Sequence, residues 1–159
     1  MTSDARLTHV DERGQARMVD VSGKPVSARE ATATGFVRCS PAVVGLLRGG
    51  GVPKGDALAV ARLAGIQAAK RTPDLVPLAH PVAVHAVSGD LAGADDGVDI
   101  TATVRTADRT GVEMEALTCV AVAALALVDM VKAVDKLTTI TDVRVTAKSG
   151  GRSGDWCRG

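Results

Sequence analysis

Residues 98–105 read VDITATVR, and this stretch decides the fold class. From Val98 to Val104 every second residue is apolar and the residues between them are polar, which is typical of a strand with one buried face. Residues 81–88 form a second expected strand, and the turn-rich residues 89–97 between the two strands predict a hairpin. Because a hairpin pairs its strands in opposite directions, the sheet is expected to contain antiparallel pairs.

Two further alternating stretches, residues 31–38 and 143–148, also predict strands. Three helices are expected, at about residues 41–48, 57–71 and 116–136. This mixture predicts an α+β domain with helices packed on one face of an antiparallel sheet. No internal repeat or long linker is visible, so residues 1–159 are expected to form a single domain, with a loose arm at 1–16 and a glycine-rich tail at 149–159.

The expected helices differ in how they begin and in what they bury. Ser40 and Asp56 precede the first two helices as N-cap residues, whose side chains accept hydrogen bonds from the first turn. In the second helix Ala61, Gly65 and Ala69 lie four apart on one face, a smooth strip that lets another backbone approach closely. The third helix is apolar on nearly every side over most of its length, which predicts burial between the sheet and a further element or subunit.

The charge balance and composition exclude several classes of partner. The chain carries 19 Lys and Arg against 18 Asp and Glu, a net charge of +1, which gives no field strong enough to hold nucleic acid or an anionic membrane. One Phe and one Trp cannot build a base-stacking platform. The N-terminus lacks a secretory signal, and the longest apolar run, residues 119–128, is shorter than the roughly 20 residues that span a bilayer. We therefore expect a cytoplasmic protein.

The three cysteines, Cys39, Cys119 and Cys157, form no C-x-x-C pair, so neither a disulfide framework nor a metal site is expected. Residues 54–56 (KGD) place Lys54 and a glycine at a helix start, where backbone N–H groups favour an anion. The alternative is a helix cap with an exposed lysine.

Two prolines stiffen residues 75–81 (LVPLAHP) around His80. A rigid segment that presents one imidazole suits proton transfer or phosphate contact near neutral pH. The alternative is a turn whose histidine bonds only a backbone carbonyl.

Two further clusters of charged residues could also carry chemistry. If residues 111–115 are extended, the carboxylates of Glu113 and Glu115 point to the same side, and their repulsion raises one pKa, which suits an acid–base pair. The alternative is a solvated strand edge. Asp129, Lys132 and Lys136 fall on one stripe of the third helix. They form either surface ion pairs or a site where the aspartate tunes the pKa of a lysine.

A helix that begins near residue 116 places Asp129 about 20 Å further along its axis. One small substrate cannot easily contact both this aspartate and the Glu113–Glu115 pair of the same chain. A pocket shared between two subunits is the simplest arrangement that brings them together.

These clusters carry a resemblance to a known family. The stretches concerned are residues 18–24 (MVDVSGK), 54–56 (KGD), 64–70 (AGIQAAK), 77–81 (PLAHP), 111–118 (GVEMEALT), 129–136 (DMVKAVDK) and 148–155 (KSGGRSGD). Together they closely resemble the MoaC-type cyclic pyranopterin monophosphate synthases of molybdenum cofactor biosynthesis. The resemblance covers nearly the whole chain, from residue 7 to residue 155.

The resemblance implies a ferredoxin-like fold assembled as a hexamer, a trimer of dimers with active sites at subunit interfaces. It implies a lyase that converts (8S)-3′,8-cyclo-7,8-dihydroguanosine 5′-triphosphate to cyclic pyranopterin monophosphate with release of pyrophosphate. Asp129, Lys132 and Lys54 match the family's catalytic residues. The residues expected to contact the substrate are Leu78, Ala79, His80, Glu113, Met114, Glu115 and Lys70. No cofactor is expected, although Mg²⁺ often arrives with a nucleotide.

Two departures from the family pattern stand out. Ala79 occupies a position where the family often has cysteine, so a thiol there is not expected to be essential. The loop at residues 49–53 also differs from that of its relatives. Two other classes of function remain as alternatives: a regulatory oligomer that binds a nucleotide without turnover, and a structural scaffold whose charged residues only solvate its surface.

Overall fold

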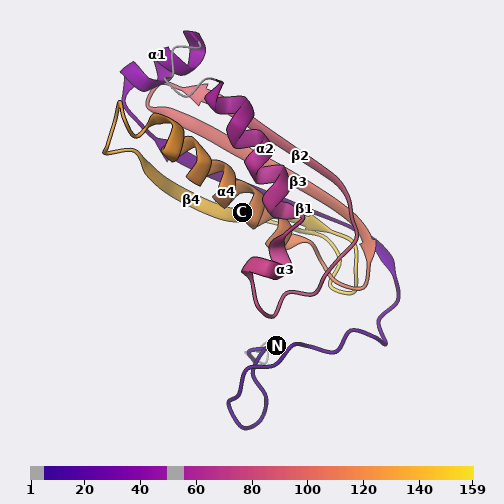
Figure 1. Ribbon diagram of the computed structural model, residues 1–159. Coiled ribbons are helices and arrows are strands. Elements are labelled where there is room, and N and C mark those ends of the chain that lie inside the picture. Colours follow the sequence, from indigo (N-terminus) through magenta and orange to yellow (C-terminus); the bar gives the residue numbers. More distant parts are fainter. Residues whose placement is uncertain (1–5, 50–55) are drawn as a thin grey trace.

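The computed structural model describes residues 6–49 and 56–159. Its elements in chain order are β1 (Ser27–Arg38), α1 (Pro41–Gly49), α2 (Ala57–Ala69), α3 (Thr72–Leu75), β2 (Val84–Ala94), β3 (Gly97–Asp108), α4 (Glu113–Val131), β4 (Thr139–Ser149) and β5 (Trp156–Cys157). The strands form one sheet in the order β2-β3-β1-β4-β5, with every neighbouring pair antiparallel. Helices α2 and α4 lie side by side over one face of this sheet (Figure 1). The predicted α+β, ferredoxin-like arrangement is confirmed.

The predicted hairpin is present, but its turn is shorter than the sequence indicates. Strand β2 runs from Val84 to Ala94 and β3 begins at Gly97, so the connection is a two-residue turn at residues 95–96. Two glycines of the expected loop, Gly89 and Gly93, lie inside β2, where Gly89 is paired with Ala102. Because glycine has no side chain, it does not show which face of the sheet it occupies. The alternation of polar and apolar residues is therefore lost in the sequence before β2 ends.

Both predicted N-caps are confirmed. The backbone N–H of Val43 donates to Ser40 Oγ (3.3 Å), and that of Ala59 donates to Asp56 Oδ1 (3.0 Å). Helix α2 ends near Lys70 as expected, but a further turn of helix, α3, begins at Thr72 because proline is accommodated in a first helical turn.

Helix α4 forms the centre of the core, although its predicted bounds are wrong at both ends. It begins at Glu113, where the N–H of Ala116 donates to the carbonyl of Val112 (3.0 Å). It ends at Val131, because Asp135 accepts a hydrogen bond from the backbone of Ser40 (2.9 Å) and the chain turns back. By length and hydropathy alone α4 is comparable to a membrane span, and half of its most apolar stretch is buried inside this domain.

Helix α2 crosses α4 closely at the predicted smooth strip. Ala61, Gly65 and Ala69 are all buried. A Cβ built on Gly65 would lie 2.7 Å from the carbonyl oxygen of Cys119 and 3.1 Å from the Cβ of Ala123. The absence of a side chain at Gly65 therefore sets how closely the two helices approach.

We expect Gly65→Ala to destabilise the domain, whereas Gly45→Ala, with open space around its Cβ in α1, should stabilise it slightly. Both variants gain the same helix propensity, so the difference between them isolates the clash with α4. We expect a difference of about 2 kcal/mol in the free energy of unfolding. Urea denaturation of the two variants in parallel measures it, and equal stabilities would contradict the close approach.

The N-terminal segment lies outside the sheet. It extends from the start of β1 past the end of the domain that carries α3 (Figure 1). Within it an isolated bridge pairs Val10 with Ala16, so part of the predicted loose arm forms a local turn. The segment that follows, residues 18–24, approaches the loop after α3 and forms one wall of the site described below.

Candidate active site

One cavity of about 750 Å³, here called the main cavity, gathers six of the residues expected to contact substrate: Leu78, Ala79, His80, Glu113, Met114 and Glu115. They come from the loop after α3 and from the first turn of α4. The N-terminal segment closes the cavity with Val19, Val21 and Lys24. Stretches that are far apart in the sequence therefore meet at one place.

His80 is held by a backbone contact from the N-terminal segment. Its Nε2 is hydrogen-bonded to the carbonyl of Val19, 61 positions away in the chain. Because a carbonyl only accepts, Nε2 must carry the proton, and the lone pair of Nδ1 remains as the acceptor of the neutral ring. The backbone-carbonyl contact of the alternative hypothesis is thus present, and the histidine nonetheless lines the main cavity.

The expectation that Glu113 and Glu115 lie on an extended chain is wrong. Both belong to the first turn of α4, where residues two apart point about 200° away from each other. Glu115 is turned into the protein and is 3% exposed, whereas Glu113 is half-buried. The helix starts early because Val112 and Ala116 are both fully buried beside it.

The two carboxyl groups consequently have different environments. Burial, together with the smaller effect of the negative charge on Glu113, raises the pKa of Glu115 to about 7. Glu113 Oε1 lies 3.4 Å from Lys148 Nζ. A carboxyl group that is half-protonated near neutral pH can both donate and accept a proton, so Glu115 has the properties of a general acid or base.

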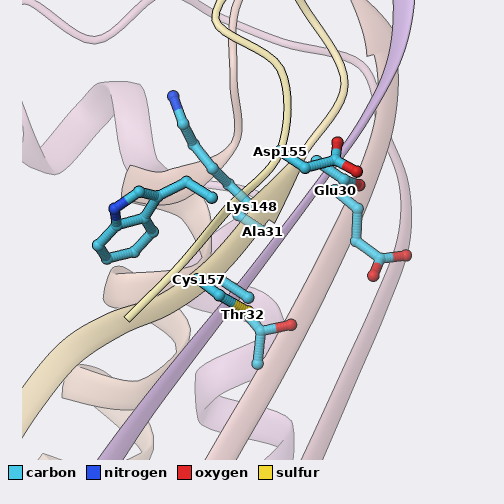
Figure 2. Close-up of a pocket in the computed structure, with 9 residues that line it drawn as sticks. Glu30, Ala31, Thr32, Lys148, Asp155 and Cys157 are labelled. Atoms are coloured by element: carbon cyan, nitrogen blue, oxygen red, sulfur yellow. The ribbon is translucent and has the colours of Figure 1, made fainter. Parts of the chain in front are cut away.

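Lys148 reaches this site because β4 is irregular. Strict alternation from Val145 predicts that Lys148 points to the open face of the sheet, together with Arg144. In the structure the register slips between the partners of Thr32 and Ala33, and Lys148 becomes the partner of Ala31, which faces the core. The extra residue in β4 is a β-bulge, which re-aims the side chains beyond it. Figure 2 shows the side chains of Lys148 and Thr32 leaving neighbouring strands in different directions.

The predicted catalytic residues on α4 lie at its other end. Lys132 Nζ donates to Asp129 Oδ1 at 2.8 Å, and the two side chains are 61% and 53% exposed. Glu115 precedes Asp129 by 14 residues, or about 21 Å of helix, so the structure does not bring them together within one chain. The expected stripe also loses Lys136, because the helix stops before it.

Lys70 and Lys54 are the two remaining lysines of the predicted site. Lys70 caps the C-terminus of α2 and is exposed. Lys54 lies outside the residues that the structure describes. Among the described residues there is no cluster of three or more His, Cys, Asp or Glu side chains that could hold a metal ion.

Sequence reasoning missed two cations of the site, Lys24 and Lys148, as side chains with a role. Both lie in stretches quoted above for the resemblance, 18–24 and 148–155, and that was the available signal. Lys148 lies beside Glu113 because of a bulge, and Lys24 lines the main cavity because of the path of the N-terminal segment. Neither feature is visible in a hydrophobic pattern.

The glycine-rich tail forms an edge strand. Ala147 pairs with Cys157 and Lys148 with Trp156, and the segment encloses a cavity of about 390 Å³ beside β1 and β4 (Figure 2). Glu30 and Asp155 bring carboxylates to this tail cavity, and none of the predicted site residues lines it.

The geometry agrees with what comparison with known proteins gives. A family model described as the MoaC family matches residues 18–151, from the N-terminal segment of the main cavity to the bulged strand and its loop. The chain belongs to the MoaC family.

Members of this family from several bacteria are close relatives. A protein of Streptomyces coelicolor named cyclic pyranopterin monophosphate synthase is 71% identical over 153 residues, which is 96% of this chain and 90% of that protein. One from a Nocardioides species with the same name is 67% identical and covers 98% of both chains. A protein of Mycobacterium tuberculosis named cyclic pyranopterin monophosphate synthase 2 is 57% identical over 96% of this chain and 91% of its own.

Proposed function

We propose that this protein is a cyclic pyranopterin monophosphate synthase. Its substrate is (8S)-3′,8-cyclo-7,8-dihydroguanosine 5′-triphosphate, and its products are cyclic pyranopterin monophosphate and pyrophosphate. The observation that carries the proposal is the main cavity, which unites His80, Met114 and Glu115 with the N-terminal segment in a chain that matches the MoaC family. The activity named for its relatives fits this cavity. The protein is proposed to act in the cytoplasm.

The proposed site is completed by a second copy of the chain. Asp129 and Lys132 are about 21 Å from Glu115 along α4, too far for one small substrate. The paired helices also leave apolar side chains uncovered: Leu63 on α2 is 66% exposed and Leu125 on α4 is 60% exposed. Such a surface is typical of a protein–protein contact. A dimer across it, and a hexamer built from three such dimers, are part of the proposal.

The reaction is proposed to run by acid–base catalysis from lysine and aspartate side chains. The purine five-membered ring opens, a pyrazine ring forms, and a cyclic phosphate closes as pyrophosphate leaves. Lys132, held by Asp129 at 2.8 Å, is placed to give and take protons, and Lys54 is assigned the same role from the resemblance. Glu115, whose pKa burial raises to about 7, can take either protonation state at the other side of the substrate.

The remaining residues of the main cavity hold the substrate. His80 and Glu113 orient the base through hydrogen bonds, while Leu78, Ala79 and Met114 provide the apolar wall. Lys70 is assigned to the phosphates with the other cations. No cofactor is part of the proposal, and Mg²⁺ enters only as a companion of the triphosphate.

Incubation of the purified full chain with the cyclised guanosine triphosphate, followed by assay of pyrophosphate and pterin product, tests the function. We expect both products in equal amounts. Binding without pyrophosphate release would favour the regulatory oligomer, and absence of any binding would favour the structural scaffold. Either of these two results would refute the proposed synthase.

A further inference from the structure

The turn that follows α4, residues 132–138, begins with Lys132 and buries little apolar surface of its own. Val131, the last residue of α4, is fully buried. Beyond it Val134 is 44% exposed and Leu137 is 86% exposed. Side-chain burial therefore fixes the chain up to the end of α4, and hydrogen bonds have to fix the turn that comes after it.

Asp135 supplies these hydrogen bonds from the middle of the turn. Its Oδ2 accepts from the backbone N–H of Ser40 (2.9 Å), and its Oδ1 accepts from that of Leu137 (2.9 Å). The N–H of Asp135 donates to the carbonyl of Val131 (3.1 Å). Its carbonyl accepts from the hydroxyl of Thr138 (2.8 Å). One half-buried residue thus joins the end of α4, the turn and the start of α1.

The bond to Ser40 connects parts of the chain that are 95 positions apart. Ser40 is the N-cap of α1, so the carboxylate of Asp135 is tied to a residue that a helix already holds in place. Hydrogen bonds in which the acceptor is ionised are shorter and stronger than those between neutral groups. Figure 1 shows α1 and the connection between α4 and β4 at the same end of the sheet.

Lys132 lies between these two fixed points. Its backbone N–H donates to the carbonyl of Val128 (2.9 Å) on the helix side, and Asp135 follows three residues later. The ion pair between Lys132 and Asp129 is largely exposed, and exposed ion pairs are weak. The position of Lys132 Nζ therefore depends on how firmly the backbone of Lys132 is held.

We propose that Asp135 is a positioning residue for Lys132. Its carboxylate clamps the turn after α4 to the start of α1 and thereby places Lys132 Nζ against the substrate. This inference rests on the proposed function, in which Lys132 gives and takes protons. Asp135 itself is assigned no contact with the substrate. Displacement of a reacting group by about 1 Å can cost about 10² in rate, so loss of the clamp affects the chemical step and leaves binding in the main cavity unchanged.

Single-turnover assays of Asp135→Asn and Asp135→Ala at saturating enzyme test the proposal. An amide has one acceptor oxygen where a carboxylate has two, so asparagine leaves one of the two backbone N–H groups without its acceptor. We expect the rate constant for pyrophosphate release to fall about tenfold in Asp135→Asn and about 10²-fold in Asp135→Ala, with an unchanged steady-state KM. Asp90→Asn, which alters an exposed carboxylate on β2, is the matched control and should keep the wild-type rate constant.

This measurement separates positioning from mere stability. At saturating enzyme the rate constant of a single turnover does not depend on the folded fraction, so partial unfolding would leave it unchanged. A double-mutant cycle adds a second test. Because Asp135 acts through Lys132, Asp135→Asn should have little further effect on the residual rate of Lys132→Ala. An equal loss in both backgrounds, or an unchanged rate constant in Asp135→Asn, would overturn the positioning role.

Backbone amide hydrogen exchange tests the clamp without any turnover. The amides of Ser40 and Lys132 should exchange at least about tenfold faster in Asp135→Asn than in the wild type or in Asp90→Asn, because the end of α4 then opens locally. Unchanged exchange would overturn the clamp. If the wild type releases no pyrophosphate while exchange still rises in the variant, the clamp on Lys132 stands and the synthase falls. If the wild type releases pyrophosphate and Asp135→Asn keeps its rate constant, the synthase stands and the positioning role falls.

Discussion

Lys132→Ala is expected to lower the rate of pyrophosphate release by a factor of about 10² to 10⁴, because it removes a positioned proton donor. The side chain is exposed and hydrogen-bonds to Asp129 at the end of α4, so the fold should persist without it. Lys136→Ala is the matched control, since α4 ends before that residue. Single-turnover assays measure the chemical step directly, and near wild-type product formation by Lys132→Ala would refute the proposed role.

The same variant tests whether the site is shared between subunits. His80→Ala should impair the main cavity, whereas Lys132→Ala impairs the far end of α4. If two chains build each site, a mixed dimer has one intact site and one doubly altered site. Refolding the two variants together in equal amounts should then restore about a quarter of the wild-type sites, because half of the dimers are mixed. Activity of the mixture no greater than the mean of the two separate variants would place the whole site within one chain.

Replacement of the buried carboxyl group in Glu115→Gln is expected to change how stability depends on pH. The pKa of Glu115 is about 7 in the folded protein, against an ordinary value of 4.5. Between these pH values the folded state binds more protons than the unfolded state, so the contribution of this group to stability falls as pH rises from 4.5 to 7. The loss reaches about 3 kcal/mol and is complete above pH 7.

Glutamine cannot ionise, so Glu115→Gln should be more stable than the wild type at pH 8 and nearly equal to it at pH 4.5. Chemical denaturation across this range measures the difference. The protein concentration is fixed, because the proposed subunit association would also affect stability. Glu12→Gln, an exposed change on the N-terminal segment, is the control. A stability difference between Glu115→Gln and the wild type that does not vary with pH would contradict a raised pKa at Glu115.

The parts of the fold with one buried face were predictable from the sequence. In β3 the buried residues Val98, Ile100, Ala102 and Val104 alternate with more exposed ones, and the hydrophobic pattern records that burial directly. The N-caps were predictable for a similar reason, since a cap depends on a side chain and a backbone group three residues away.

The details of the site were less accessible. The start of α4 is decided by burial of Val112 and Ala116 against the rest of the domain, and a local reading of the GVEME stretch does not contain that information. The extended conformation predicted for Glu115 is therefore wrong, although Glu115 does line the main cavity as a predicted site residue. The contact between His80 and Val19 joins segments 61 residues apart, and no local pattern records such a contact.

The bulge in β4 makes the site sensitive to the number of residues in a strand as well as to their identity. One extra residue between Val145 and Ala147 decides that Lys148 meets Glu113 and not the opposite side of the sheet. A deletion of one residue at the bulge would leave every functional amino acid in the sequence, yet it would turn Lys148 away from Glu113. Only an insertion or deletion of an even number of residues in this strand would therefore keep Lys148 on the same face of the sheet. Substitution data alone do not reveal this restriction.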